Sequence, residues 1–210
     1  TRPYTLSLHD ALPISHSSAR ALNDVSRNLD DEQLMMLKEK GGVVQTVAFR
    51  SYVNTEKNNA YNEKAEAIIK EVAKAEGFDI VDRSAIRDMA DEAREKYFND
   101  YMAIREKAKP RIAAEVNPVA PPVDVSDFVD HIDYLVGKIG IDHVGISSDF
   151  DGGGGVEGWN DASETFNVTL ELVRRGYTEE EIGKLWSGNL LRVLDETQAV
   201  AKKIQAGETL

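Results

Sequence analysis

Residues 141–155 constrain the fold of this chain more than any other stretch. They read Ile-Asp-His-Val-Gly-Ile-Ser-Ser-Asp-Phe-Asp followed by four glycines. The first half alternates apolar and small residues, as a short buried strand does, and a sharp turn with Asp149 and Asp151 follows. α/β enzymes keep their chemistry at the carboxyl ends of strands, so the stretch predicts a strand that presents a carboxylate there. The glycines suit a tight loop over a metal or ligand, and equally a plain turn.

Strand and helix signals alternate along much of the remaining chain. Residues 42–49 are rich in β-branched residues and predict a second, buried strand, and part of a third strand is expected near His16. Four helical segments are predicted from caps, apolar spacing and glycine stops. The first, residues 30–41, has the capping pair Asp30 and Gln33 and an apolar face of Leu34, Met35 and Leu37, and the second is residues 126–140. The third, residues 166–176, has the apolar face Phe166, Leu170 and Val173. The fourth, residues 178–194, starts with the capping box Thr178 and Glu181, is expected to break at Gly188, and continues with the apolar residues Leu190, Val193 and Leu194.

Residues 55–115 interrupt this alternation with a strongly charged, helical composition. Helices are predicted at residues 62–75 and 84–109, and Pro110 is expected to end the second. Such a helical insertion suits a lid or an oligomer contact, the latter implying a homodimer. A solvated helical hairpin without a chemical role is the more ordinary interpretation. A stiff linker at residues 118–122 is expected to follow.

Composition excludes several classes of protein. The net charge of −12 disfavours a nucleic-acid or anionic-membrane partner. No window reaches the ~18 to 20 apolar residues of a transmembrane segment, and no signal peptide is visible. The absence of cysteine excludes disulfides and thiolate metal sites. The compartment stays open between periplasmic, secreted and cytoplasmic locations.

The two ends of the chain differ in character from the segments between them. Residues 4–14 resemble one reading frame of a sequencing adapter, so we expect residues 1–14 to be a non-native segment and the protein to enter near Ser15. A native loop and strand is the alternative interpretation. On the first interpretation His9 and Asp10 are not counted as ligands. Residues 198–210 form a polar tail that is expected to fray.

The alternation predicts an α/β fold with parallel strands and right-handed crossovers. Three strands do not close a barrel, and a (β/α)8 barrel needs about 250 residues. We therefore expect residues 15–197 to be the carboxyl-terminal part of a (β/α)8 TIM-like barrel, incomplete and with a helical insertion. The remaining strands would lie upstream of Ser15.

Four segments resemble, in order and spacing, the carboxyl-terminal half of the membrane dipeptidase (renal dipeptidase) family, peptidase family M19. They are Ser-His-Ser-Ser-Ala at 15–19, Ser-Arg-Asn-Leu-Asp-Asp at 26–31, Val-Gly-Ile-Ser-Ser-Asp-Phe-Asp-Gly at 144–152 and Gly-Asn-Leu-Leu-Arg-Val at 188–193. The resemblance extends from Ser15 to about Leu194. It implies that the barrel is a TIM-like metal-dependent hydrolase barrel. Such an enzyme would hold two zinc ions, bridged by a carboxylate and a water, and would cleave dipeptides with a free carboxyl terminus.

The resemblance also implies roles for particular residues. His16 would be an imidazole ligand of one zinc and Asp149 a carboxylate ligand of the other, which are donors that zinc accepts. Asp149 would also be catalytic, passing a proton between water and the leaving amine, and it would touch the substrate. Arg27 would receive the carboxylate of the dipeptide. Tyr52 and Phe49 are candidates for the side-chain pocket.

Alternatives stay open at several of these positions. Taken singly, His16 is a polar loop histidine, Arg27 a surface charge and Asp149 a turn residue. The family's His-x-Asp pair, bridging glutamate and further zinc-binding histidine have no counterpart after Ser15. We therefore expect a zinc-dependent dipeptidase of which this chain is a truncated and inactive fragment. The alternative is a non-catalytic binding protein on a hydrolase-like scaffold.

Other sites are excluded or assigned to structure. A phosphate-binding glycine loop lacks its motif, and an EF-hand calcium loop lacks its later oxygen ligands. His131 lies between charged residues on a predicted helix, and His143 opens a strand at the end away from the predicted site. Both are assigned to structure.

Overall fold

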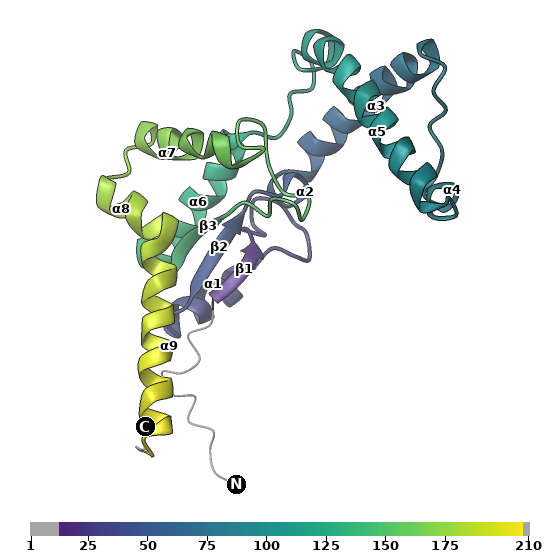
Figure 1. Ribbon diagram of the computed structural model, residues 1–210. Helices are drawn as coiled ribbons and strands as arrows, with labels where there is room; N and C mark the ends of the chain where they lie inside the picture. Colours follow the sequence, from purple (N-terminus) through teal and green to yellow (C-terminus); the bar gives the residue numbers. More distant parts are fainter. Residues whose placement is uncertain (1–12, 208–210) are drawn as a thin grey trace. The chain divides into compact units, whose positions relative to one another are not determined.

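The structure is a computed structural model that describes residues 13–207 (Figure 1). The chain divides into two compact units. One joins the part up to Thr55 with the part from Val123 onward, and the other is Glu56–Pro122. The expectations for His9 and Asp10, and for all but the last two residues of the segment 1–14, lie outside the described residues.

Three parallel strands form the sheet of the first unit in the order β1-β2-β3. They are β1 (Pro13–Ser17), β2 (Val43–Val47) and β3 (Val144–Ser147), and their arrows run side by side in Figure 1. Every residue of β2 is buried, because this strand has a neighbour on each side and is covered on both faces. The predicted parallel α/β arrangement and all three predicted strands are confirmed.

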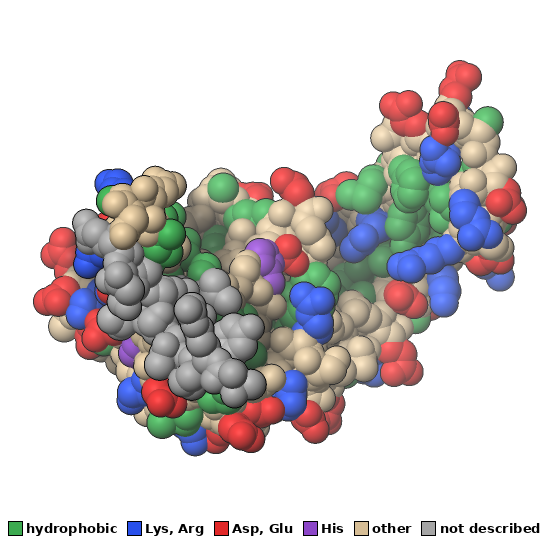
Figure 2. Space-filling model, turned by 90° about the horizontal axis from the view of Figure 1, so that it is seen from below, with side chains coloured by type: hydrophobic (Ala, Val, Ile, Leu, Met, Phe, Trp, Pro, Cys, Tyr) green, Lys and Arg blue, Asp and Glu red, His purple; other side chains and the backbone are tan. Residues whose placement is uncertain are grey.

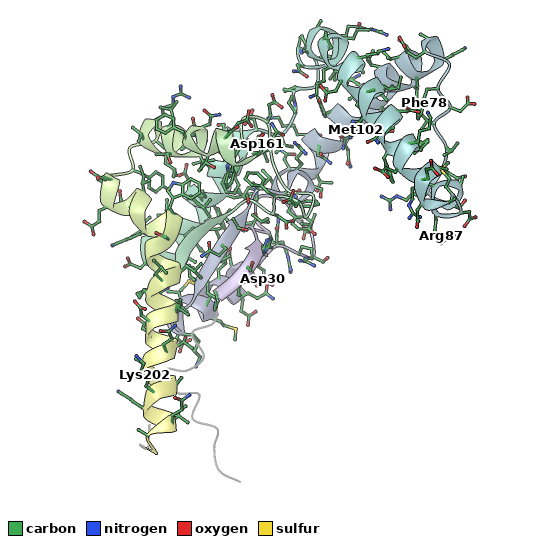
Figure 3. All side chains as sticks on the ribbon, in the orientation of Figure 1. Asp30, Phe78, Arg87, Met102, Asp161 and Lys202 are labelled. Atoms are coloured by element: carbon green, nitrogen blue, oxygen red, sulfur yellow. The ribbon has the colours of Figure 1, made fainter. Side chains whose placement is uncertain are left out.

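Helices α1 (Asp31–Glu39) and α6 (Val125–Ile139) precede β2 and β3 and pack against the sheet and against each other. The core between these elements is apolar. It contains Leu34, Leu37, Val44, Phe128, Ile132, Leu135 and Val144. The predicted capping box of Asp30 and Gln33 is present, but Met35 is about half exposed and does not belong to the apolar face of α1. Figure 3 labels Asp30 at the amino end of this helix.

Helical segments flank β3 and continue to the end of the described chain. They are η3 (Ile141–His143) just before the strand, then η4 (Ala162–Glu164), α7 (Thr165–Arg174), α8 (Glu179–Gly183), η5 (Lys184–Gly188) and α9 (Asn189–Gln205). Thr178 and Glu181 form the predicted capping box of α8. The expected break at Gly188 is wrong, because the π-helical turn η5 joins α8 to α9 without interruption. Helix α9 extends through the first part of the segment expected to fray, as far as Gln205, and includes Lys202, which is labelled in Figure 3.

The predicted apolar face of α7 is wrong. Phe166 is 70% exposed and Val173 is 55% exposed, whereas Val168 and Leu172 are buried. The aliphatic i, i+4 pair Val168 and Leu172 thus faces the core, whereas Phe166 and Val173 face outward. In α9 only one of the three predicted apolar residues is buried, namely Val193, whereas Leu190 and Leu194 are 39% and 48% exposed.

The second unit is helical. It comprises most of α3 (Thr55–Ala75), then α4 (Arg83–Arg87), α5 (Asp91–Arg111) and the π-helical turn η2 (Ile112–Val116). Its core packs Ile68 and Ile69 of α3 against Ile104 of α5, and the Phe78 ring, labelled in Figure 3, lies 5.3 Å from that of Tyr97.

Three predictions for the helices of the second unit are wrong. The first helix begins at Thr55, seven residues before the predicted position 62, and the single helix predicted at residues 84–109 is two helices, α4 and α5. Pro110 lies inside α5 and does not end it. The chain continues by widening into η2, where the Asn117 N–H donates to the Ile112 carbonyl five residues back.

Charge and hydropathy agree with the composition. Figure 2 shows acidic and basic side chains interspersed over one face of the molecule. Within residues 13–207, no helix combines the length and the apolar character needed to cross a bilayer.

Candidate functional site

His16 lies in a β-bulge near the end of β1. The strand pairs Ile14 with Val44 and then Ser17 with Thr46, so β1 has one residue more than β2 between these two pairs. His16 takes up this irregularity with a φ of 63°, a left-handed conformation that histidine adopts more readily than most residues. A bulge redirects a side chain that regular pairing would fix. The chain thereby turns the imidazole of His16 away from its regular position.

Asp149 follows β3 in a turn that glycine makes possible. Its φ is 55°, and its carbonyl accepts hydrogen bonds from the N–H groups of Gly152 at 3.1 Å and Gly154 at 2.8 Å. A β-carbon at Gly154 would lie 2.1 Å from the Ser148 carbonyl oxygen, which is too close for any other residue type. The glycine run therefore wraps the backbone tightly around Asp149.

The side chains of His16 and Asp149 meet. His16 Nε2 lies 3.3 Å from Asp149 Oδ1, and the two side chains are 41% and 26% exposed. On its other side, His16 Nδ1 contacts the hydroxyl of Ser15. Both backbones are left-handed, and such conformations in non-glycine residues gather at functional sites. The structure thus brings together an imidazole and a carboxylate at the carboxyl ends of β1 and β3.

Arg27 and Tyr52 form a second contact pair, which joins the segment after β1 to the segment after β2. The guanidinium carbon of Arg27 lies 5.8 Å from the Tyr52 ring centroid, and the Tyr52 ring stacks on Phe49 with centroids 4.5 Å apart. Ser17, the residue after His16, donates through its hydroxyl to the Arg27 carbonyl at 2.9 Å.

Phe49 connects this pair with the turn that carries Asp149. A β-carbon at Gly153 would lie 3.3 Å from the Phe49 ring, and Gly155 donates to the carbonyl of Ala48 at 2.7 Å. Ala48 and Phe49 follow β2, and the glycines follow β3. Tyr52 and Asp149 therefore lie beyond the carboxyl ends of neighbouring parallel strands, with His16 near the carboxyl end of β1 and Arg27 against the Tyr52 ring.

The number of metal donors is smaller than a zinc site requires. His16 and Asp149 have the right chemistry for zinc, but a catalytic zinc is held by three protein ligands and a structural one by four. Within residues 13–207, no group of three histidine, aspartate or glutamate side chains is close enough to hold an ion. These two donors alone do not fit a complete zinc centre, so no zinc-dependent step is assigned to this chain by itself.

Two buried polar residues lie beside the site: Asn28, which sequence reasoning did not single out, and His131, which it assigned to structure without a partner. Both are nearly inaccessible and bind backbone groups of the segments that follow β1 and β2. Burial lowers the pKa of His131, with the hydrogen bond to the Val53 carbonyl acting in the opposite direction. The sequence signal for Asn28 was its place next to Arg27; His131, flanked by charged residues, gave none. His143 binds the Gly42 carbonyl at the opposite end of the sheet.

Comparison with known proteins identifies a family that the chain matches. The family model described as "Membrane dipeptidase (Peptidase family M19)" matches residues 10–208. The chain is 30% identical over 193 residues to dipeptidase ataJ of Aspergillus terreus, and 27% identical over 191 residues to dipeptidase aclJ of Aspergillus oryzae. It is also similar to the crystal structure of the probable dipeptidase PvdM from Pseudomonas aeruginosa, with a TM-score of 0.57 and 36% identity.

The matches cover nearly all of this chain but only part of each relative. The matches cover 91% and 90% of this chain but only 32% of ataJ and 31% of aclJ, and the PvdM match covers 90% of this chain and 46% of that one. The chain thus spans about a third of the length of its curated relatives. Since the family model matches nearly all of it, this chain belongs to the membrane dipeptidase family, peptidase family M19.

Proposed function

We propose that this chain supplies part of the active site of a zinc-dependent dipeptidase, an enzyme that hydrolyses the peptide bond of dipeptides with a free carboxyl terminus. Family membership supports the reaction class. One observation carries the proposal for this chain: the 3.3 Å contact between His16 and Asp149, which come from opposite edges of the sheet.

Each predicted site residue has a proposed role. His16 and Asp149 are ligands of a centre that holds two zinc ions when complete, and Asp149 moves a proton between water and the leaving amine. Arg27 receives the substrate's carboxylate; its side chain is exposed and its planar guanidinium can bind a carboxylate through two hydrogen bonds. Tyr52 lines the substrate site and steadies Arg27 through its ring face.

We further propose that residues 15–197 are the carboxyl-terminal part of a (β/α)8 barrel, with residues 55–115 as a helical insertion. Parallel strands alternating with helices support this architecture, and so does the gathering of His16, Arg27, Tyr52 and Asp149 at the carboxyl ends of the strands. Oligomer formation through the insertion, giving a homodimer, is a separate proposal, tested by light scattering at several protein concentrations.

The proposal includes the inactivity of this chain on its own. Two donors do not hold two zinc ions, and the described residues offer no third donor beside them. The alternative is a non-catalytic binding protein on the same scaffold, which the low donor count equally favours. It differs in predicting that a longer chain with every strand of the fold would still not hydrolyse dipeptides.

A dipeptide titration tests the substrate class. NMR spectra of the isotope-labelled chain are recorded with L-Ala-L-Ala and with its carboxyl-terminal amide. We expect shifts at Arg27 and Tyr52 with the free acid only, because the amide lacks the charge that the guanidinium binds. Arg27→Gln should abolish these shifts, whereas Arg87→Gln, a change at the exposed arginine labelled in Figure 3, should preserve them. Equal shifts with acid and amide would refute the role of Arg27.

Zinc content and dipeptide turnover test the proposed inactivity of this chain on its own. After incubation with zinc and removal of the excess, we expect less than one zinc per chain and no hydrolysis of L-Ala-L-Ala, with a full-length M19 dipeptidase as the positive control. Robust turnover by the 210-residue chain would show that two donors suffice and would refute the proposed inactivity.

A further inference from the structure

His131 on α6 connects the two segments that carry the proposed substrate residues. It is 2% exposed. Its Nδ1 accepts a hydrogen bond from the Ala19 N–H at 3.1 Å, and its Nε2 lies 2.8 Å from the Val53 carbonyl oxygen. An N–H can only donate and a carbonyl can only accept. His131 must therefore be a neutral imidazole with its proton on Nε2.

The two backbone groups lie next to proposed site residues. Ala19 is three residues after His16, and Val53 directly follows Tyr52. Asn28 makes a parallel connection: its Oδ1 accepts from the Ser18 N–H at 3.1 Å, and its Nδ2 donates to the Tyr52 carbonyl at 2.8 Å. Two buried amide or imidazole groups thus span the same gap, from the segment after β1 to the segment after β2.

We propose that His131 is a positioning residue for the dipeptide site, holding the segment with His16 and Arg27 in register with the segment that carries Tyr52. This inference rests on the proposed function. The imidazole accepts a hydrogen bond from the Ala19 N–H and donates one to the Val53 carbonyl. An apolar side chain of the same size can form neither of these hydrogen bonds. Without it, the buried Ala19 N–H loses its partner.

Three substitutions separate the two hydrogen bonds. An Asn side chain places its amide oxygen near the position of Nδ1, and a Gln side chain places its amide nitrogen near the position of Nε2. His131→Asn therefore keeps the acceptor for Ala19, His131→Gln keeps the donor to Val53, and His131→Phe keeps neither. Amide hydrogen exchange of Ala19, divided by that of Leu135 in the middle of α6, reports the local effect free of global destabilisation.

We expect Ala19 exchange in His131→Asn to stay within about threefold of the wild-type ratio, and in His131→Gln and His131→Phe to rise by about tenfold or more. His143→Asn is the matched control, since His143 also binds a backbone carbonyl but at the amino end of β3, and the ratio should not change. Equal ratios in Asn and Gln variants, or the same rise in the control, would overturn the inference. If His131→Phe does not fold, the comparison of Asn with Gln still decides.

Dipeptide affinity connects the local effect to the site. In the L-Ala-L-Ala titration we expect His131→Gln to weaken binding by about tenfold and His131→Asn to weaken it less, following Ala19 exchange. Unchanged affinity despite an exposed Ala19 amide would refute positioning while leaving the proposed function intact. Absence of binding by the wild-type chain would refute the proposed function, and the Ala19 ratios would then still test whether His131 orders the segment.

Discussion

Protonation of the buried His131 side chain opposes folding. Burial lowers its pKa in the folded chain below the ordinary value of about 6.5, so the unfolded chain binds more protons between the two values. Stability therefore rises with pH in that interval. The contribution of His131 is complete above about pH 6.5 and is lost as the pH falls toward the folded pKa.

We accordingly expect the free energy of unfolding to decrease from pH 7 to pH 5, with a slope from His131 of at most about 1.4 kcal/mol per pH unit. In His131→Asn this part of the slope should disappear, although the variant is less stable overall. Urea unfolding of both proteins at several pH values provides the measurement. Parallel curves for the two proteins would contradict a neutral, buried imidazole.

Gly154 permits the tight turn around Asp149. A methyl group there would meet the Ser148 carbonyl oxygen at 2.1 Å and the Asp149 β-carbon at 2.6 Å, so the backbone would have to move. We expect Gly154→Ala to lower the free energy of unfolding by about 1–3 kcal/mol. It should also separate Asp149 from His16, seen as loss of the nuclear Overhauser contacts between them.

Gly183 provides the control for this substitution. It lies in α8 with ordinary helical dihedrals, and nothing lies within 4 Å of an added β-carbon. Gly183→Ala should therefore be neutral or stabilising by about 0.5–1 kcal/mol. A similar loss of stability in both variants would show that close approach is not what Gly154 provides.

At the scale of elements, Arg175 joins the end of α7 to α6. Its guanidinium donates to Asp130 and Asp133 at 2.6 Å each, to Glu171 at 2.9 Å and to the Ser126 carbonyl at 2.8 Å. The carboxylates raise the pKa of Arg175 against the opposing effect of burial. Tyr177 adds a hydrogen bond to Asp133 at 2.7 Å. One planar cation therefore fixes the angle between two helices.

Arg175→Lys should lower the free energy of unfolding by about 1–3 kcal/mol, because a single ammonium cannot reach all of these acceptors. Arg174→Lys is the neighbouring control: this side chain is mostly exposed, with one ion pair at 3.6 Å to Glu171, and the change should stay within about 0.5 kcal/mol. Chemical denaturation measures both. Equal effects of the two substitutions would mean that the network contributes no more than a surface ion pair.

Prediction from sequence worked best where the signal is local. The Asp30–Gln33 and Thr178–Glu181 capping boxes and the strand at residues 43–47 depend on neighbours in the chain, and the structure has all three. The exposure of Phe166 and the continuation of α5 past Pro110 depend on how each helix packs against the rest of the molecule. The spacing of apolar residues within one helix does not show which of its faces is packed.

The site shows the same division at the scale of the whole molecule. Sequence motifs located His16 and Asp149, and the predicted strands placed both at the carboxyl ends of parallel strands. The bulge that redirects His16, and the hydrogen bonds of His131 across 112 positions to Ala19, arise only when distant segments pack together. Motifs therefore gave the identities of the site residues, while the residues that position them became visible only in the fold.

The central proposal is that His16 and Asp149 belong to one metal-binding centre, so that a zinc ion bound by this chain alone would contact both. A double-mutant cycle in Zn²⁺ affinity tests it, with His16→Ala, Asp149→Ala, the double variant, and His143→Ala as control. We predict weak zinc binding by the wild-type chain, a loss of about tenfold or more in each single variant, little further loss in the double variant, and no change in the control. Additive losses, or unchanged affinity in either single variant, would contradict the claim.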